Sequence, residues 1–269
     1  MSSTLSLIIL GAVQGLAEFL PVSSSGHLAL MQIFMGMKGP QMSLDLALHV
    51  ATLLAVFAYF GRDMATLLQQ FIRGFRSPEA RRSDGWRYGW SILAGTAVTA
   101  ALGIPLKPVV EMASQNSLWV GCGLIITGAV LILSRYVPQG ERRVGLLVGM
   151  MVGLAQGLAV MPGVSRSGMT IVAGLIMGLA PVEAFRFSFL LSVPAIVGAT
   201  LLEWLDLEGA FMAYLPQGWV FGFVTASLLG LASLVVLKRV SIFRAWWVFG
   251  AYCAVVGLGV VGFSLLGVY

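Results

Sequence analysis

The feature that constrains this chain most is a series of apolar stretches, each suited to cross a lipid bilayer as a helix. A transmembrane helix needs about 20 predominantly apolar residues. Six stretches are long and apolar enough, at residues 44–60, 88–106, 118–134, 185–202, 217–237 and 246–266. Only 10% of the residues are charged, too few to cover a water-soluble fold of 269 residues. The sequence therefore predicts an all-α polytopic membrane protein with a single membrane domain, 1–269.

Two further apolar regions, at 4–36 and 144–180, are each interrupted by turn-forming residues. The interruptions are PVSSSGH at 21–27 and PGVSRSG at 162–168. Clusters of Pro, Ser and Gly favour turns over a continuous helix. Each region is therefore predicted to form a re-entrant hairpin, in which two short helices enter and leave the membrane on one side.

Basic residues are concentrated in alternate loops. Twelve of the sixteen Lys and Arg residues lie within 61–87, 135–143 and 238–244. The intervening loop 203–216 carries acidic residues and no basic one, namely Glu203, Asp206 and Glu208. Because short loops rich in Lys and Arg stay in the cytoplasm, we expect these three loops there and both termini outside. This distribution accounts for the net charge of +5, so no nucleic-acid partner is expected.

The two interrupted regions contain an internal repeat. QGLAEFLPVSSSG at 14–26 aligns without a gap with QGLAVMPGVSRSG at 156–168, with eight of thirteen positions identical. Three predicted spans follow each copy, so the second half should be inverted relative to the first. We expect repeat 1 at about 1–135 and repeat 2 at about 144–269, each a re-entrant helix hairpin plus three transmembrane helices. Hairpins of such inverted repeats enter from opposite sides and meet near the midplane.

The two copies differ where a reaction would need different side chains. The first carries Glu18, Ser24 and His27, whereas the second has Arg166 at the position of Ser24. An ionised side chain at membrane depth costs several kcal/mol unless it is paired or hydrated. The sequence therefore predicts a polar site between the hairpins, with a purely structural pair of Glu18 and Arg166 as the alternative.

Gln14 precedes Glu18 by four residues, so both side chains share one face of the first short helix. Amide and carboxylate oxygens are ligands that suit Mg²⁺ or Ca²⁺. We predict a partial metal site at these two residues, with packing of the Gln14 amide as the alternative. His49 follows Asp45 by four residues and is interpreted as a helix-packing histidine in preference to a partner of the site.

The Ser- and Gly-rich turns suit phosphate. Glycine lets the backbone approach a ligand, and the amides of a turn can point several N–H groups at an anion. The guanidinium of Arg166 presents a planar fork that matches phosphate oxygens. The predicted diphosphate-binding residues are Ser23, Ser25, Gly26, Ser165, Arg166, Ser167, Gly168 and Thr170.

The segments QGLAEFLPVSSSGH at 14–27 and PGVSRSGMTI at 162–171 resemble the two signature segments of the undecaprenyl-diphosphatase, or bacitracin-resistance, family. The likeness extends over the whole chain, including DLALHVATLLAV at 45–56 and FSFLLSVPAIVGAT at 187–200. Both signatures are long and occur in the expected order, which makes the resemblance specific.

The resemblance assigns roles to individual residues. The metal-binding pair of the family maps onto Gln14 and Glu18, and this chain has Gln where some members have Glu. The motif Ser, His and Arg map onto Ser24, His27 and Arg166. With Glu18, these three are the expected catalytic residues. His27 is expected to act as acid or base, and either Ser24 or an activated water attacks phosphorus.

The resemblance also implies an activity, the hydrolysis of undecaprenyl diphosphate to undecaprenyl phosphate and inorganic phosphate. This reaction recycles the lipid carrier for peptidoglycan synthesis and is linked to bacitracin resistance. A divalent cation, Mg²⁺ or Ca²⁺, and a homodimer are implied as well. The expected location is the bacterial inner (plasma) membrane, with the active site open to the outer face. The alternative function is a flippase for polyprenyl phosphate, alone or in addition to hydrolysis.

Overall fold

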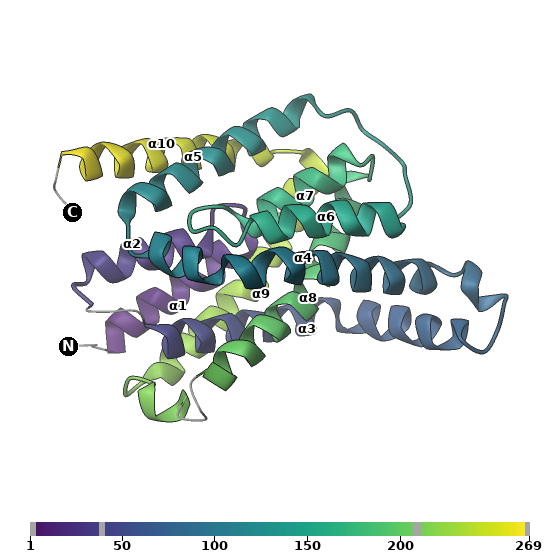
Figure 1. Ribbon diagram of the computed structural model, residues 1–269, viewed down its shortest axis with the longest axis horizontal. Helices are drawn as coiled ribbons and strands as arrows, with labels where there is room; N and C mark the ends of the chain where they lie inside the picture. Colours follow the sequence, from purple (N-terminus) through teal and green to yellow (C-terminus); the bar gives the residue numbers. More distant parts are fainter. Residues whose placement is uncertain (1–3, 38–40, 207–210, 267–269) are drawn as a thin grey trace.

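The computed structural model describes residues 4–37, 41–206 and 211–266, and these residues form helices and connections without a β-strand (Figure 1). Four shorter helices are paired as α1 (Thr4–Phe19) with α2 (Ser24–Phe34), and α6 (Leu146–Leu158) with α7 (Arg166–Ile176). Six longer helices are α3 (Met42–Gly74), α4 (Asp84–Ser114), α5 (Ser117–Leu133), α8 (Pro181–Asp206), α9 (Trp219–Phe243) and α10 (Trp246–Leu265). Three 3₁₀ turns lie at η1 (Ala80–Arg82), η2 (Ser134–Tyr136) and η3 (Phe211–Tyr214).

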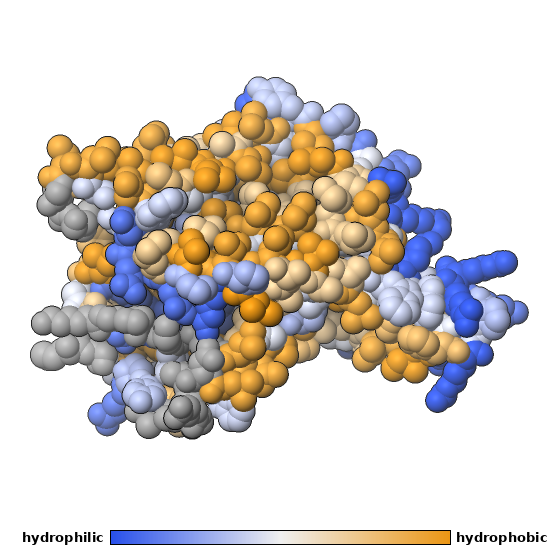
Figure 2. Space-filling model, in the orientation of Figure 1, coloured by the Kyte–Doolittle hydropathy of each residue, from blue (hydrophilic) through white to orange (hydrophobic). Residues whose placement is uncertain are grey.

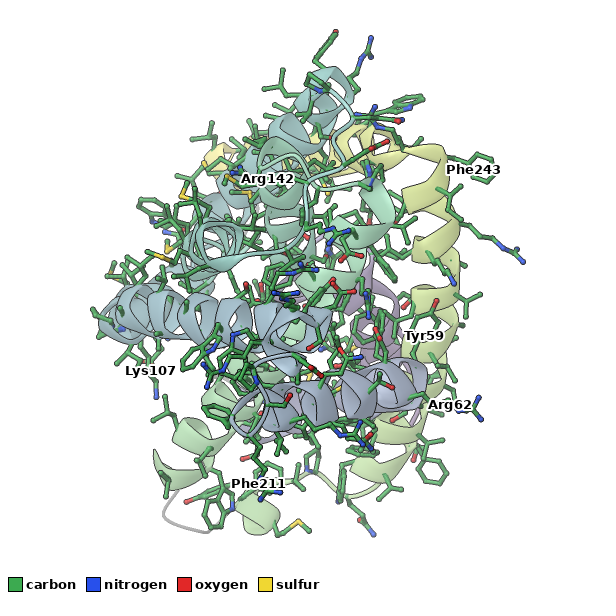
Figure 3. All side chains as sticks on the ribbon, turned by 90° about the vertical axis from the view of Figure 1, so that its right-hand side faces the viewer. Tyr59, Arg62, Lys107, Arg142, Phe211 and Phe243 are labelled. Atoms are coloured by element: carbon green, nitrogen blue, oxygen red, sulfur yellow. The ribbon has the colours of Figure 1, made fainter. Side chains whose placement is uncertain are left out.

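The prediction of an all-α polytopic membrane protein is confirmed. Within the described ranges, six helices are long and apolar enough to cross a membrane, and they correspond to the six predicted spans. Large apolar side chains are exposed on the outer faces of these helices, such as Leu228 and Phe243. Viewed along the molecule in Figure 3, Phe243 points outward from the bundle, as expected for a surface in contact with lipid.

The predicted loop 61–87 is largely wrong, because α3 and α4 continue well beyond their apolar runs. Only 75–83 connects them, and the two helices project together from the body of the molecule (Figure 1). Aromatic rings hold this extension together: Trp86 lies 5.5 Å from Phe71 and 5.1 Å from Phe75 between ring centroids. The projecting end is hydrophilic in Figure 2, whereas the middle of the molecule is mostly hydrophobic.

The three basic connections lie at one end of the molecule. A cavity of about 400 Å³ is lined by Arg87 of α4, Arg143 of the α5–α6 connection and Arg186 of α8, so these segments meet there. Arg244, between α9 and α10, donates a hydrogen bond of 2.5 Å to the carbonyl of Val137 in the α5–α6 connection. The start of α1 and the end of α10 lie at the opposite end (Figure 1). Of the predicted acidic loop, Glu208 lies outside the described residues, as do the side chains of Glu203 and Asp206.

The two predicted hairpins are present, each as two short helices joined by a turn. They enter the bundle from opposite ends, and their turns meet inside it (Figure 1). A Cβ added to Gly26 would lie 3.1 Å from the Cα of Gly163, a tight contact between the two turns. The hairpin tips are thus in direct contact.

Each hairpin packs on a span of the other half. Helix α1 lies along α9, and α6 lies along α4. Both contacts use small residues: the backbone of Gly11 touches that of Gly222, and the backbone of Gly153 touches that of Gly95. Small residues let membrane helices approach closely. The exchange of equivalent partners fits two related halves, and the inverted relation of the complete halves stays a prediction.

Candidate active site

The site is centred on Glu18, in the last turn of α1, whose side chain is 1% exposed. Its Oε2 accepts hydrogen bonds from Gln14 Nε2 at 3.0 Å and from Ser24 Oγ at 2.6 Å. The same oxygen lies 3.7 Å from His49 Nε2. Its other oxygen, Oε1, forms an ion pair with the guanidinium of Arg166. Four helices, α1, α2, α3 and α7, therefore contribute to one buried carboxylate.

Of the predicted residues, the structure brings Gln14, Glu18, Ser24 and Arg166 together. Residues 18 and 166 are 148 positions apart in the chain and meet because the two hairpin tips meet. The cluster holds one buried carboxylate between two basic side chains. The guanidinium of Arg166 is the group of this cluster that suits an anion.

His49 was interpreted as a packing residue, and the structure places its side chain beside Glu18, within the predicted site. Its Nδ1 forms a hydrogen bond of 2.8 Å with the carbonyl of Asp45, one turn earlier in α3, and this contact directs Nε2 towards Glu18. A carbonyl only accepts hydrogen bonds, so Nδ1 carries a proton. The available signal was the position of His49 within an apolar span, where an ionisable side chain is by default a candidate for function.

His27, by contrast, has its two described hydrogen bonds with groups outside this cluster. Its Nδ1 lies 2.8 Å from the carbonyl of Ser23, and its Nε2 lies 2.8 Å from the hydroxyl of Tyr252 on α10. Among the described contacts, none joins His27 to Glu18 or Ser24. Tyr252 was not recognised in the sequence, although the hydroxyl of a tyrosine in the middle of an apolar span usually forms a hydrogen bond.

Both hairpin tips are capped in the same way. The hydroxyls of Ser23 and Ser165 accept hydrogen bonds from the amides of Gly26 (3.3 Å) and Gly168 (3.1 Å). Helices α2 and α7 therefore begin at the tips, and their N-termini point to the place where the tips meet. A helix N-terminus carries partial positive charge and unpaired N–H groups, which bind phosphate groups well.

The tips differ in access to their hydroxyl groups. Ser25 is exposed and Ser24 is partly exposed, whereas Ser165 and Ser167 are both buried. The hydroxyl of Ser167 lies 3.2 Å from that of Ser165 and 3.5 Å from the carbonyl oxygen of Leu20. The serines of the second tip are therefore engaged within the protein.

Thr170, also predicted to bind diphosphate, lies one turn into α7. Its hydroxyl donates to the carbonyl of Arg166 at 2.8 Å and contacts the hydroxyl of Ser188 on α8. It is 1% exposed. The structure thus places Thr170 in the contact between α7 and α8, with no described side-chain contact to Glu18.

A divalent cation fits the residues around Glu18. The Gln14 side-chain oxygen is buried and has no hydrogen-bond partner among the described residues. Together with the Glu18 carboxylate it offers the hard oxygen donors that Mg²⁺ or Ca²⁺ takes. No group of three or more His, Cys, Asp and Glu residues in the described parts of the chain forms a complete metal site. The protein therefore offers part of a coordination shell, which substrate oxygens and water would complete.

The second tip has a similar glutamine without a carboxylate. Gln156, the counterpart of Gln14, also has a buried side-chain oxygen without a described partner, and its Nε2 donates to Thr99 at 3.2 Å. No carboxylate accompanies it, since Val160 stands at the position of Glu18. Only in the first tip does the amide oxygen lie near a carboxylate, that of Glu18, so only this tip offers two oxygen ligands for a cation.

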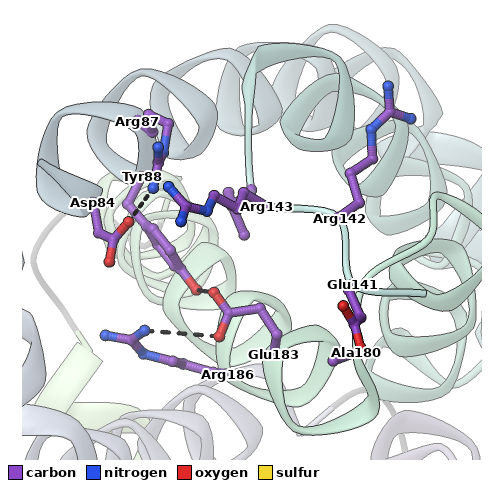
Figure 4. Close-up of a pocket in the computed structure, with 10 residues that line it drawn as sticks. Asp84, Arg87, Tyr88, Glu141, Arg142, Arg143, Ala180, Glu183 and Arg186 are labelled. Atoms are coloured by element: carbon purple, nitrogen blue, oxygen red, sulfur yellow. Dashed lines mark hydrogen bonds and ion pairs between the residues drawn. The ribbon is translucent and has the colours of Figure 1, made fainter. Parts of the chain in front are cut away.

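The cavity at the basic end is a separate feature (Figure 4). Its lining contains ion pairs of Arg87 with Asp84 and of Arg186 with Glu183, and Glu183 also accepts a hydrogen bond from Tyr88. Asp63 completes this network by pairing with Arg186, with 2.6 Å between Oδ2 and Nε. These pairs join α3, α4 and α8 at the basic end of the molecule, and the candidate active site lies at the hairpin tips instead.

Fold and site together define a multi-pass membrane protein with two re-entrant hairpins and a charged site at their meeting point. The sequence matches the family described as "Bacitracin resistance protein BacA" over residues 7–259. The chain belongs to this family.

Three curated relatives carry the name "Undecaprenyl-diphosphatase". The relative from Desulfosudis oleivorans is 42% identical over 260 residues, which cover 93% of this chain and 94% of the relative. The relative from Treponema denticola is 39% identical, with 96% of each chain covered. The relative from Methanosphaera stadtmanae is 37% identical, with 96% of this chain and 97% of the relative covered. The likeness thus extends over nearly the whole chain.

Proposed function

We propose that this protein hydrolyses undecaprenyl diphosphate to undecaprenyl phosphate and inorganic phosphate in the membrane. The names of the relatives support the substrate and the reaction. The observation that carries the proposal is the hydrogen bond of 2.6 Å from the Ser24 hydroxyl to Glu18, beside Arg166 and two helix N-termini. This arrangement pairs a nucleophile with a base next to groups that bind phosphate.

In the first step, the Ser24 oxygen attacks the terminal phosphorus and its proton passes to Glu18. The bond from that phosphorus to the bridging oxygen breaks, and undecaprenyl phosphate leaves. In the second step, water attacks the phosphoserine and gives a proton to His27, and the bond between phosphorus and the Ser24 oxygen breaks as that oxygen takes back the proton from Glu18. An adjacent carboxylate is a recognised way to activate a hydroxyl nucleophile.

Arg166 and the tips hold the diphosphate. The guanidinium, 24% exposed, releases part of its contact with Glu18 to the phosphate oxygens. The N-termini of α2 and α7 supply amide donors and partial positive charge on the same side. In phosphoryl transfer, such positioning and charge neutralisation account for most of the catalysis.

Gln14 and Glu18 would hold a divalent cation, for which their oxygens are suited. When bound, the cation neutralises charge on the diphosphate. The amide of Gln14 keeps the carboxylate oriented through the hydrogen bond of 3.0 Å, so the two residues act as one unit.

The proposed location is the inner membrane, with the basic end of the molecule in the cytoplasm and the active site open to the outer face. The basic connections at one end of the molecule support this orientation through the positive-inside rule. A homodimer belongs to the same proposal and derives from the family resemblance. The orientation is testable in a variant without native cysteines. We expect Glu79→Cys and Gln139→Cys to be shielded from an impermeant thiol reagent added outside, and Gln217→Cys to react; the reverse pattern would refute it.

Hydrolysis and transport make different demands on the site. A flippase needs anion binding and a moving gate, whereas a phosphatase also needs a positioned nucleophile, and the contact between Ser24 and Glu18 favours the latter. The deciding experiment measures phosphate release from undecaprenyl diphosphate by purified protein in detergent, where membrane sidedness is lost. We expect release by the wild type and none above background by Ser24→Ala. A folded wild type that releases no phosphate with Mg²⁺ or Ca²⁺ would refute the proposal.

A further inference from the structure

The imidazole of His27 is held at both of its nitrogens. Nδ1 lies 2.8 Å from the carbonyl oxygen of Ser23, which can only accept, so Nδ1 carries the proton. In a neutral imidazole Nε2 is then an acceptor. The hydroxyl of Tyr252, 2.8 Å away, is therefore the donor in this contact.

The contact also fixes the plane of the ring. The rings of His27 and Tyr252 are stacked, with centroids 5.6 Å apart and planes inclined by 14°. Tyr252 belongs to α10 and is 225 residues away in the chain, so the second half of the protein orients a side chain of the first tip. In the described parts of the chain, no other side chain forms a hydrogen bond with His27.

We infer that Tyr252 is a positioning residue for His27. Its hydroxyl stabilises the tautomer with an unprotonated Nε2, and it gives up this contact when Nε2 accepts a proton from the attacking water during phosphoserine hydrolysis. This inference rests on the proposed function and assigns the residue that prepares its acid–base group.

The alternative is that Tyr252 only packs between α2 and α10. Tyr252→Phe distinguishes the positioning role from the packing role, because it keeps the stacked ring and removes only the hydroxyl. Tyr59→Phe is the matched control: Tyr59 also lies in a span, its ring packs 4.7 Å from that of Phe60, and its hydroxyl has no described hydrogen-bond partner.

The direct measurement is ¹⁵N NMR of the histidine side chains in the detergent-solubilised protein. The chain has only two histidines, His27 and His49, so His49→Gln assigns the signals. We expect a protonated Nδ1 and an unprotonated Nε2 for His27 in the wild type and in Tyr59→Phe. In Tyr252→Phe we expect a population protonated at Nε2. Unchanged His27 signals in Tyr252→Phe would overturn the inference, whether or not the protein hydrolyses its substrate.

The kinetic measurement is a double-mutant cycle. We expect Tyr252→Phe to lower kcat about 10-fold and to leave KM within about 2-fold, since the hydroxyl serves a proton transfer and not substrate binding. In the His27→Gln background, Tyr252→Phe should have no further effect, because the hydroxyl acts through His27. Equal effects in both backgrounds would overturn the inference, as would a change confined to KM.

Discussion

The two hairpin tips start from the same sequence pattern and reach different structures. Ser23 caps α2 with a φ of 71°, a strained value for a residue with a side chain, whereas Ser165 caps α7 with an ordinary φ of −76°. The second tip is bound to α5, where Thr127 donates to Gly163 at 3.0 Å and accepts from the Ser165 amide at 2.9 Å. The first tip contacts α10 through a side chain, since His27 Nε2 lies 2.8 Å from the Tyr252 hydroxyl, and its backbone accepts a weak bond from Cys253 at the carbonyl of Pro21, 3.7 Å away.

This difference gives the two tips different roles in the proposed reaction. The first is strained, accessible and equipped with Glu18 and Ser24, which is typical of a segment that performs chemistry. The second is anchored and has buried hydroxyls, and it presents one functional side chain, Arg166. Under the proposed function, the first copy of the repeat supplies the nucleophile and the base, and the second adds Arg166 to the binding of the substrate. The following substitutions test this division, from the largest expected effect to the smallest.

The largest difference is expected between serines of the two tips. Ser24→Ala removes the nucleophile and should lower turnover at least ~1,000-fold. Ser167→Ala removes a buried hydroxyl of the second tip and should cost about 1 kcal/mol of stability, with turnover within about 3-fold of the wild type. Both are checked by phosphate release and thermal unfolding of the purified variants. Similar losses of turnover in the two variants would contradict the division.

The second effect concerns the carboxylate that only the first tip has. Glu18→Gln keeps the shape of the side chain and removes its charge, so it should lower turnover about 100-fold through loss of the base. The dependence on Mg²⁺ or Ca²⁺ should weaken in the same variant. Gln156→Glu is the control, because it adds a carboxylate to the second tip, and it should not increase activity. Near-normal turnover of Glu18→Gln with an unchanged metal titration would remove Glu18 from the site.

The third substitution tests whether Arg166 clamps phosphate or only pairs with Glu18. Lysine keeps the positive charge and loses the planar fork. Arg166→Lys should therefore lower turnover ~10-fold, about 1.4 kcal/mol of transition-state stabilisation, while the melting temperature changes little. Under a purely structural role, Lys would serve nearly as well and Arg166→Ala would chiefly reduce stability. Measuring rate and melting temperature on the same samples distinguishes these outcomes.

Much of the fold and of the site centre was predictable from the sequence, because it depends on local composition. Apolar length defines the spans, Pro, Ser and Gly define the turns, and the gapless repeat indicates that the tips are related. The meeting of Glu18 with Arg166 follows, since two opposite charges at membrane depth need each other. These features can be predicted without knowing how each helix is rotated about its axis.

The contacts that depend on helix rotation were not predictable. Helix α10 is apolar on all sides, so its sequence does not indicate which face meets α2. The contact between Tyr252 and His27 could therefore not be predicted. His49 posed the same problem in α3, because either a lipid-facing or an inward position was compatible with its neighbours. The helical extension of α3 and α4 was missed for another reason: it is held by aromatic contacts such as Phe71 with Trp86, and not by apolar length.

The smallest effect is expected at His49, which joins the first tip from outside the repeat. Its Nε2 lies 3.7 Å from Glu18 and its side chain is 32% exposed, so the interaction is weakened by solvent. A partly exposed pair of this kind is worth up to ~1 kcal/mol, which corresponds to about 5-fold in rate. His49→Leu should therefore lower turnover about 5-fold if the pair orients the Glu18 carboxylate for Ser24. His49→Gln keeps a hydrogen-bond donor and should recover part of this loss. A packing role predicts the reverse order, since Leu fills an apolar contact better than Gln, and a melting temperature raised by Leu with unchanged turnover would establish that role.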